Sequence, residues 1–159
     1  VAYSGDSALP LRGADVSNAL IELFAVTRWG ELDFLIIDMP PGISDATLDI
    51  IRFVRRIEFL IVTTSSVLAF ETVRKLVGLL SDLRVPVIGV IENMKFRENS
   101  VIGRLAAELG LRFLGAVPFD AGVEDALGDV ERLLGTVFAR RLEELVSKSD
   151  FWRLKRKGG

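Results

Sequence analysis

The sequence predicts an α/β fold in which a mostly parallel sheet carries helices on both faces. Half of the 159 residues are hydrophobic, short apolar runs of strand length recur along the chain, and a helical pattern follows each run. Strands that are apolar throughout are typical of parallel sheets, because helices cover both faces of such sheets. No apolar run reaches the roughly 18 to 20 residues of a membrane-spanning helix. The mean hydropathy of +0.38 therefore indicates a buried sheet rather than a membrane protein.

The predicted elements alternate in chain order, as βαβ units do. Apolar residues recur at helical spacing from Asp15 onward and predict an amphipathic helix that ends near Gly30. Ser44 is a suitable N-cap for the helix after the first strand. The strands are predicted over 33–38, 59–64, 87–92 and 113–117, and the further helices over 44–55, 68–83, 100–109, 123–127 and 130–146.

No linker or composition shift divides the chain, so residues 1–150 are predicted to belong to one domain and 151–159 to a basic tail. The aromatic and basic residues of 151–157 allow two interpretations, a membrane-surface helix or a solvated chain end. The segment is short and its apolar face is small, which favours the solvated end. Membrane binding is therefore not expected.

Composition excludes several kinds of chemistry. The chain contains neither cysteine nor histidine, which removes disulfides, thiolate metal sites, cysteine nucleophiles and histidine acid–base catalysis. A lack of cysteine fits a reducing compartment, so a cytoplasmic location is expected. The formal net charge of −2 argues against a nucleic-acid partner held by a positive field.

Polar or turn-forming residues follow each predicted strand. In open parallel sheets, ligands bind outside the carboxyl ends of the strands. The chemistry-bearing residues of this chain are therefore expected in four segments, 38–42, 63–66, 92–94 and 118–120.

Residue types alone leave two interpretations of each segment. Asp38 can hold a magnesium-bound water beside nucleotide phosphates, or it can cap a turn. Gly42, after two prolines, can present its N–H to a γ-phosphate or simply form a βα turn. The Asn93 amide both donates and accepts, which matches an adenine edge but equally suits a turn.

The same segments, taken together, resemble Mrp-type ATPases, a P-loop family related to MinD and ParA. Residues 33–45 (DFLIIDMPPGISD) resemble the Walker B and switch II segment, usually written DYLIIDLPPGTGD. The resemblance covers residues from about 12 to 128. Further matches follow in order and at the family's spacing at 63–64 (TT), 73–75 (VRK), 85–94 (VPVIGVIENM) and 115–120 (GAVPFD), and the upstream stretches 12–13 and 29–33 also fit.

The resemblance implies a function and a set of roles. Residues 1–150 would be the C-terminal part of one P-loop ATPase domain, similar to iron–sulfur cluster carrier ATPases. Asp38 would act on Mg²⁺ through water, and Pro41 and Gly42 would form the catalytic switch II. The family binds ATP across a homodimer and many members carry or transfer clusters, which implies ATP, Mg²⁺, a homodimer and a metallocofactor client protein. The residues on the adenine side would be Asn93, Pro118, Phe119 and Asp120.

The chain also departs from the family pattern. The Gly-rich Walker A loop, written GKGGVGKS, is absent, so this chain alone is expected to be inactive. The C-x-x-C motif after ENM is absent too, so the chain offers no iron–sulfur ligands. Ile43 and Ser44 replace the usual Thr-Gly. In the family the P-loop strand lies between the strands that here cover 33–38 and 59–64, so these two are expected to pair directly or to leave a gap.

Three functions remain open from the sequence. The first is ATP hydrolysis by the full-length protein, coupled to assembly or delivery of a metal cofactor. The second is a MinD-like regulatory or positioning ATPase. The third is a non-catalytic half-protein that binds a partner and no nucleotide.

Overall fold

The computed structural model describes residues 13–98 and 101–148 of the chain. They fall into two compact units, Val1–Arg56 and Ile57–Gly159. The predicted basic tail over 151–159 and the segment 1–12 lie outside the described residues. The elements are α1 (Gly13–Val26), α2 (Asp45–Phe53), β1 (Phe59–Thr63), α3 (Val67–Asp82), β2 (Val87–Lys95), α4 (Ile102–Glu108), β3 (Phe113–Pro118), α5 (Gly122–Asp125), α6 (Val130–Leu134) and α7 (Val137–Lys148).

In the first unit, α1 and α2 pack against each other. The Ser17 hydroxyl on α1 donates a hydrogen bond to the Asp49 carboxylate on α2. The predicted N-cap of α2 is confirmed, because the Ser44 hydroxyl accepts the Thr47 N–H at 3.3 Å. The Thr47 hydroxyl accepts the Ser44 N–H in return at 3.4 Å, which completes a capping box. The helix α1 ends at Val26, earlier than predicted.

The predicted strand over 33–38 is wrong. These residues form no strand, and Ile36 in their middle is 85% exposed. A strand needs a hydrogen-bonded neighbour, because its backbone N–H and C=O groups otherwise lack partners. The family's neighbour is the P-loop strand, and this sequence contains no such loop. Of the two expected outcomes, direct pairing does not occur, since β1 pairs only with β2 among the described residues.

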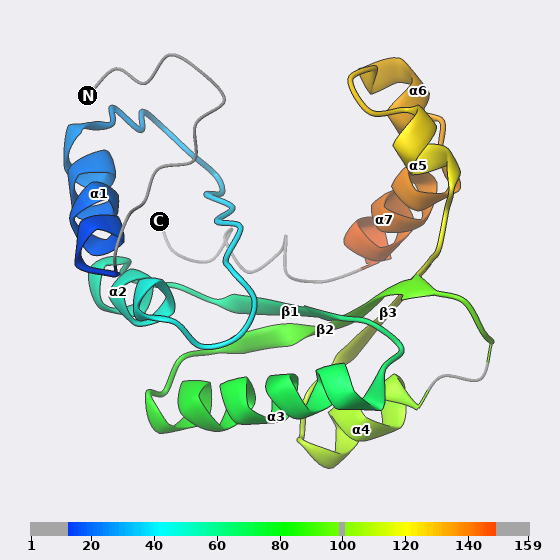
Figure 1. Cartoon of the computed structure of the whole chain (residues 1–159), viewed down its shortest axis with the longest axis horizontal. Helices are drawn as coiled ribbons and strands as arrows, with labels where there is room; N and C mark the ends of the chain where they lie inside the picture. The colour runs from blue at the N-terminus through cyan, green and yellow to red at the C-terminus, as the bar shows by residue number, and fades with distance from the viewer. Residues whose placement is uncertain (1–12, 99–100, 149–159) are drawn as a thin grey trace. The chain divides into compact units, whose positions relative to one another are not determined.

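The second unit contains one parallel sheet of three strands in the order β1-β2-β3. The strands run in the same direction, so their carboxyl ends lie at one edge, where β1 leads into α3 (Figure 1). The predicted parallel sheet is therefore confirmed in this unit. Its strands lie within two residues of the prediction at β1 and β3, whereas β2 continues to Lys95 instead of stopping at Glu92.

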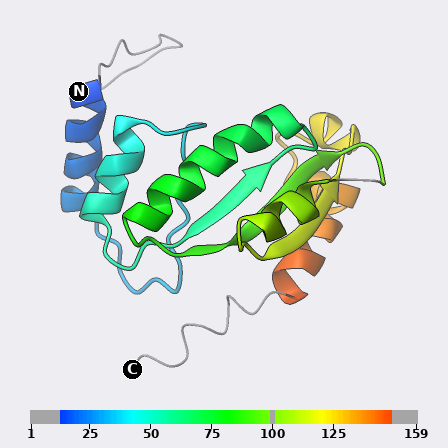
Figure 2. The ribbon, with the colours of Figure 1, turned by 90° about the horizontal axis from the view of Figure 1, so that it is seen from below.

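Helices cover both faces of the sheet, as predicted. Helices α3 and α4 lie on one face and α7 lies on the other (Figures 1 and 2). On the first face, Phe70 of α3 and Ile102 of α4 are completely buried against the strands. On the second face, Leu145 of α7 packs on Ile91 and Val117. The cover of the second face is partial, because Leu60 and Val62 of β1 are 40% and 58% exposed there.

The helix predicted over 130–146 is two helices. The first, α6, ends at Leu134, and α7 begins at Val137. The break occurs at Gly135 and Thr136, where the Thr136 hydroxyl accepts the Ala139 N–H at 3.1 Å. A hydroxyl that caps a helix start competes with continuation of the preceding helix, which a hydrophobic pattern alone does not reveal.

Candidate functional site

The carboxyl ends of the three strands form the edge where the fold places ligands. Thr63 of β1 pairs in register with Glu92 of β2, which pairs with Ala116 of β3. At the next register pair of the two strands, Lys95 lies opposite Pro118. The predicted residues Asn93, Pro118, Phe119 and Asp120 therefore lie together at this edge, within the second unit.

A β-bulge occupies the end of β2. Between the two register pairs, β2 contributes Asn93 and Met94 where β3 contributes only Val117. Met94 has a φ of 53°, which is uncommon for a residue with a side chain. Bulges and strained backbone of this kind concentrate beside binding sites, because they redirect side chains. Asn93 is half-buried, and its side-chain amide has no hydrogen bond to any described residue.

An aromatic pair follows the bulge. The rings of Phe96 and Phe119 stack with centroids 4.6 Å apart and an interplanar angle of 22°. The Phe119 N–H donates to the Lys95 carbonyl at 3.1 Å, so the two strand ends continue side by side. Phe119 is one of the predicted site residues, whereas Phe96 lies outside the motifs of the family resemblance.

Asp120 braces the chain after β3 through both of its carboxylate oxygens. Its Oδ1 accepts the Gly122 N–H at 3.0 Å, and its Oδ2 accepts the Phe138 N–H of α7 at 3.0 Å. These amides, the Phe138 N–H above all, lower the pKa of the Asp120 carboxyl below its ordinary value. With both oxygens bound to the backbone, Asp120 sets the position of Phe119 next to it.

Glu92 is the one carboxylate that is fully buried among the described residues. Its Oε1 accepts the Ser65 hydroxyl at 2.6 Å, whereas its Oε2 is buried without a partner. Ser65 itself is exposed and lies in the β1–α3 loop, so the donor to Glu92 comes from the surface of the molecule. Sequence reasoning placed Glu92 at a strand end but assigned it no role. The available signal was an acid inside an otherwise buried strand, where charges are rarely placed without a partner.

Asp38, Pro41 and Gly42 belong to the first unit. Asp38 is exposed, as is Pro41, and both lie in the segment without regular structure before α2. Gly42 has a φ of 83°, and a Cβ atom at this position would meet no heavy atom within 4 Å. Glycine is therefore required here by backbone conformation and not by space, which agrees with the conformational freedom predicted for it.

The comparison with known proteins gives the family. The family model of ParA, described as NUBPL iron-transfer P-loop NTPase, matches residues 1–148. This chain belongs to the ParA-type iron-transfer P-loop NTPases. The resemblance to Mrp-type ATPases and the α/β fold class are thereby both confirmed.

Relatives in this family carry names from iron–sulfur biology. The "Iron-sulfur cluster carrier protein" of Aquifex aeolicus is 33% identical over 134 residues, which cover 77% of this chain and 37% of that protein. The protein of the same name from Pyrococcus furiosus is 34% identical over 133 residues, covering 76% of this chain and 45% of that protein. The "Fe-S cluster assembly factor HCF101, chloroplastic" of Arabidopsis thaliana is 42% identical over 92 residues, 58% of this chain and 17% of that protein. The chain spans less than half the length of these relatives.

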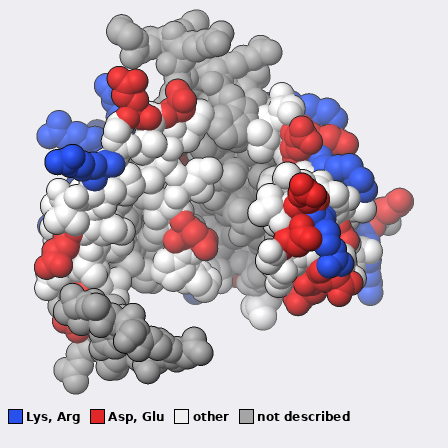
Figure 3. Space-filling view, turned by 90° about the horizontal axis from the view of Figure 1, so that it is seen from above, with Lys and Arg blue, Asp and Glu red and all other residues white. Residues whose placement is uncertain are grey.

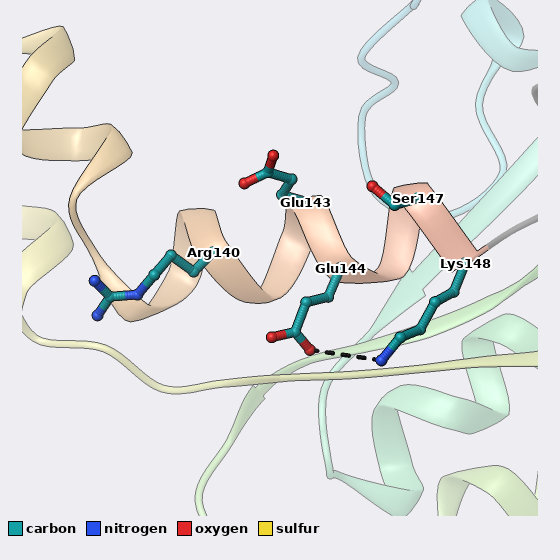
Figure 4. Close-up of a pocket in the computed structure, with 5 residues that line it drawn as sticks. All are labelled: Arg140, Glu143, Glu144, Ser147 and Lys148. Atoms are coloured by element: carbon teal, nitrogen blue, oxygen red, sulfur yellow. Dashed lines mark ion pairs between the residues drawn. The ribbon is translucent and has the colours of Figure 1, made fainter.

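A pocket also lies on α7. It has a volume of about 380 Å³ and is lined by one helix alone, through Arg140, Glu143, Glu144, Ser147 and Lys148 (Figure 4). Its charges balance one another, and Lys148 lies 3.9 Å from Glu144. Viewed from above, acidic and basic side chains alternate over α5 to α7 without a large area of one sign (Figure 3).

None of the described helices is both long and apolar enough to cross a bilayer.

Proposed function

We propose that this chain is the part of a cytoplasmic iron–sulfur carrier-type ATPase that supplies switch II and the base side of the nucleotide site. The observation that carries this proposal is the family match over residues 1–148, and the parallel sheet that brings the 92–94 and 118–120 segments to one edge supports it. The names of the relatives support a link to iron–sulfur clusters. The whole protein would act as a homodimer on a metallocofactor client protein.

The residues of the first unit suit the phosphate side chemically. Asp38 is exposed and makes no side-chain hydrogen bond or ion pair with another described residue. Its carboxylate oxygens are the hard ligands that Mg²⁺ prefers, and Asp38 would hold a water of the metal. Bound Mg²⁺ would neutralise charge on the transferred phosphoryl group. Gly42, with its positive φ and open surroundings, would turn its N–H toward the γ-phosphate.

Two parts of the proposal depend on residues outside this sequence. The Gly-rich loop that cradles phosphates would come from elsewhere in the full-length protein or from another chain. The chain contains no cysteine, so a carried cluster would be held by thiolates that this chain does not supply. A MinD-like positioning ATPase and a non-catalytic half-protein remain the alternative functions. ATP hydrolysis by the full-length protein would exclude the non-catalytic half-protein.

The test uses a protein restored to the length of its relatives, by fusing the chain to the part of the Aquifex aeolicus protein that it does not match. The fused parent is expected to hydrolyse Mg-ATP. Asp38→Asn should lower kcat at least about 100-fold while changing nucleotide affinity less than about threefold, because Asp38 acts where charge moves during phosphoryl transfer.

Asp33→Asn is the matched control, since Asp33 is an exposed acid at the start of the same segment. Its kcat is expected to stay within twofold of the parent, an allowance of about 0.4 kcal/mol. Equal turnover in Asp38→Asn and the parent would remove Asp38 from the mechanism. A fused parent that binds no nucleotide would favour the non-catalytic alternative.

A further inference from the structure

Large apolar side chains are exposed at the end of β2 and just after β3. Phe96 is 73% exposed, the largest value for any phenylalanine among the described residues, and Phe119 is 49% exposed. Met94, in the bulge just before them, is 50% exposed. Large apolar side chains gathered on a surface mark interaction sites, because water penalises their exposure.

The backbone holds this apolar group in place. The hydrogen bond from the Phe119 N–H to the Lys95 carbonyl connects the two strand ends. Asp120, the residue after Phe119, is held by the Gly122 and Phe138 amides. Hydrogen-bonded backbone on both sides of Phe119 therefore holds its ring where it stacks on Phe96. Such preorganisation reduces the entropy that binding would otherwise cost.

The neighbouring polar group indicates what would bind. Asn93 carries one acceptor and two donor hydrogens, and the described residues use none of them. At most three extended residue steps separate Asn93 from Phe96, a span of about 10 Å or less. A ring surface within about 10 Å along the chain of an amide that donates and accepts suits a nucleobase, because stacking and edge hydrogen bonds can then act together.

A protein partner would use the aromatic surface but would not need the amide. We propose that Phe96 is a base-contacting residue of the nucleotide site, whose exposed ring face stacks on the adenine while the Asn93 amide reads its edge. The inference rests on the proposed function and assigns the base side of that site to a residue outside the family motifs. Phe119 supports Phe96 from behind through the stacked pair.

The test is a saturation-transfer NMR titration of the chain with adenosine, which lacks phosphates and so does not depend on a phosphate-binding loop. The base protons H2 and H8 are expected to receive more saturation than the ribose protons. Phe96→Ala should weaken adenosine binding about tenfold, since stacking on one aromatic ring is worth that order of affinity. Asn93→Ala should weaken it as well. Ribose 5-phosphate, which has no base, is expected to show no difference between the parent and Phe96→Ala.

Phe53→Ala is the matched control, because Phe53 is a 45% exposed phenylalanine on α2 in the other unit. It should leave adenosine binding unchanged. The inference is overturned if the base protons receive no saturation from the parent, or if Phe96→Ala binds adenosine like the parent. Hydrolysis by the fused protein without a Phe96 effect would overturn this inference alone, whereas a Phe96 effect without hydrolysis would overturn the proposed ATPase activity alone.

Discussion

The Ser65 hydroxyl donates to Glu92 Oε1 at 2.6 Å, and this is the single hydrogen bond that the buried Glu92 carboxylate receives from the described residues. Oε2 is buried without a donor. A buried acceptor without a partner costs about 1 to 3 kcal/mol, and more when it is charged. We therefore expect Glu92 to lower the stability of the second unit, as groups kept for function often do.

Replacing Glu92 with an apolar residue of similar shape should stabilise the chain. We expect Glu92→Met to raise the free energy of unfolding by roughly 1 to 4 kcal/mol, because an apolar side chain needs no donor. The exposed Ser65 would then bond to water. Chemical denaturation followed by circular dichroism measures the change.

Ser65→Ala is the control for the Glu92 substitution. It removes the one donor and leaves the carboxylate with two unpaired oxygens, so it should lower the unfolding free energy by about 1 to 3 kcal/mol. If Glu92→Met is less stable than the parent, Oε2 has a donor in solution and the carboxylate contributes to stability.

The sequence predicts the sheet well where each strand has its neighbour within the chain. The strands β1, β2 and β3 follow from apolar runs between helices, and all three pair in parallel. The run over 33–38 has the same pattern but forms no strand. An apolar pattern indicates which side chains favour burial, but it does not show whether a neighbouring strand is present to pair with the backbone. Asp120 is predicted on the adenine side, and its hydrogen bond from the Phe138 N–H joins positions 18 residues apart, which no local pattern reveals. Phe96 could not be predicted as a site residue, because its role depends on stacking with Phe119, which follows the neighbouring strand.

The backbone of β3 at Gly115 leaves no room for a side chain beneath α7. Its φ is 142°, and a Cβ atom there would overlap the Leu145 side chain, which packs over it. Gly115→Ala should therefore lower the unfolding free energy by about 1 to 3 kcal/mol, through steric overlap and backbone strain. Thermal and urea unfolding give the value.

Gly78→Ala is the matched control for Gly115. Gly78 lies inside α3, and a Cβ there would meet no heavy atom within 4 Å. Alanine should stabilise α3 by up to about 1 kcal/mol, because glycine loses more backbone entropy in a helix. Equal effects of the two substitutions would show that α7 does not pack on Gly115 in solution.

Asp120 should make stability depend on acid pH. The Phe138 and Gly122 amides lower its pKa below the ordinary value of 3.8, so the unfolded chain takes up this proton at a higher pH than the native chain does. The stabilisation is present in full above pH 3.8 and is lost as the pH falls through the lower native pKa. Urea unfolding between pH 7 and pH 2 should show a steeper acid loss in the parent than in Asp120→Asn.

Two features of the Asp120 comparison decide the outcome. At neutral pH, Asp120→Asn should be less stable than the parent, because one of the two backbone N–H groups loses its acceptor. At the acid end of the range the difference between the two proteins should shrink. A difference that is constant with pH would mean that the Asp120 carboxylate is not held by these amides in solution.

The open edge of β1 should make the chain self-associate. Among the described residues β1 pairs only with β2, so one side of its backbone has no strand beside it. Leu60 and Val62 on this strand are 40% and 58% exposed. An apolar edge strand is a template for pairing with another chain. Size-exclusion chromatography over a range of concentrations should show an elution volume that decreases as concentration rises.

Val62→Lys should reduce this association, because a charge on an edge strand is costly to bury between chains, whereas Val130→Lys on α6 should not. A parent chain that elutes as a monomer at every concentration and melts cooperatively would show that the β1 edge is covered within the chain.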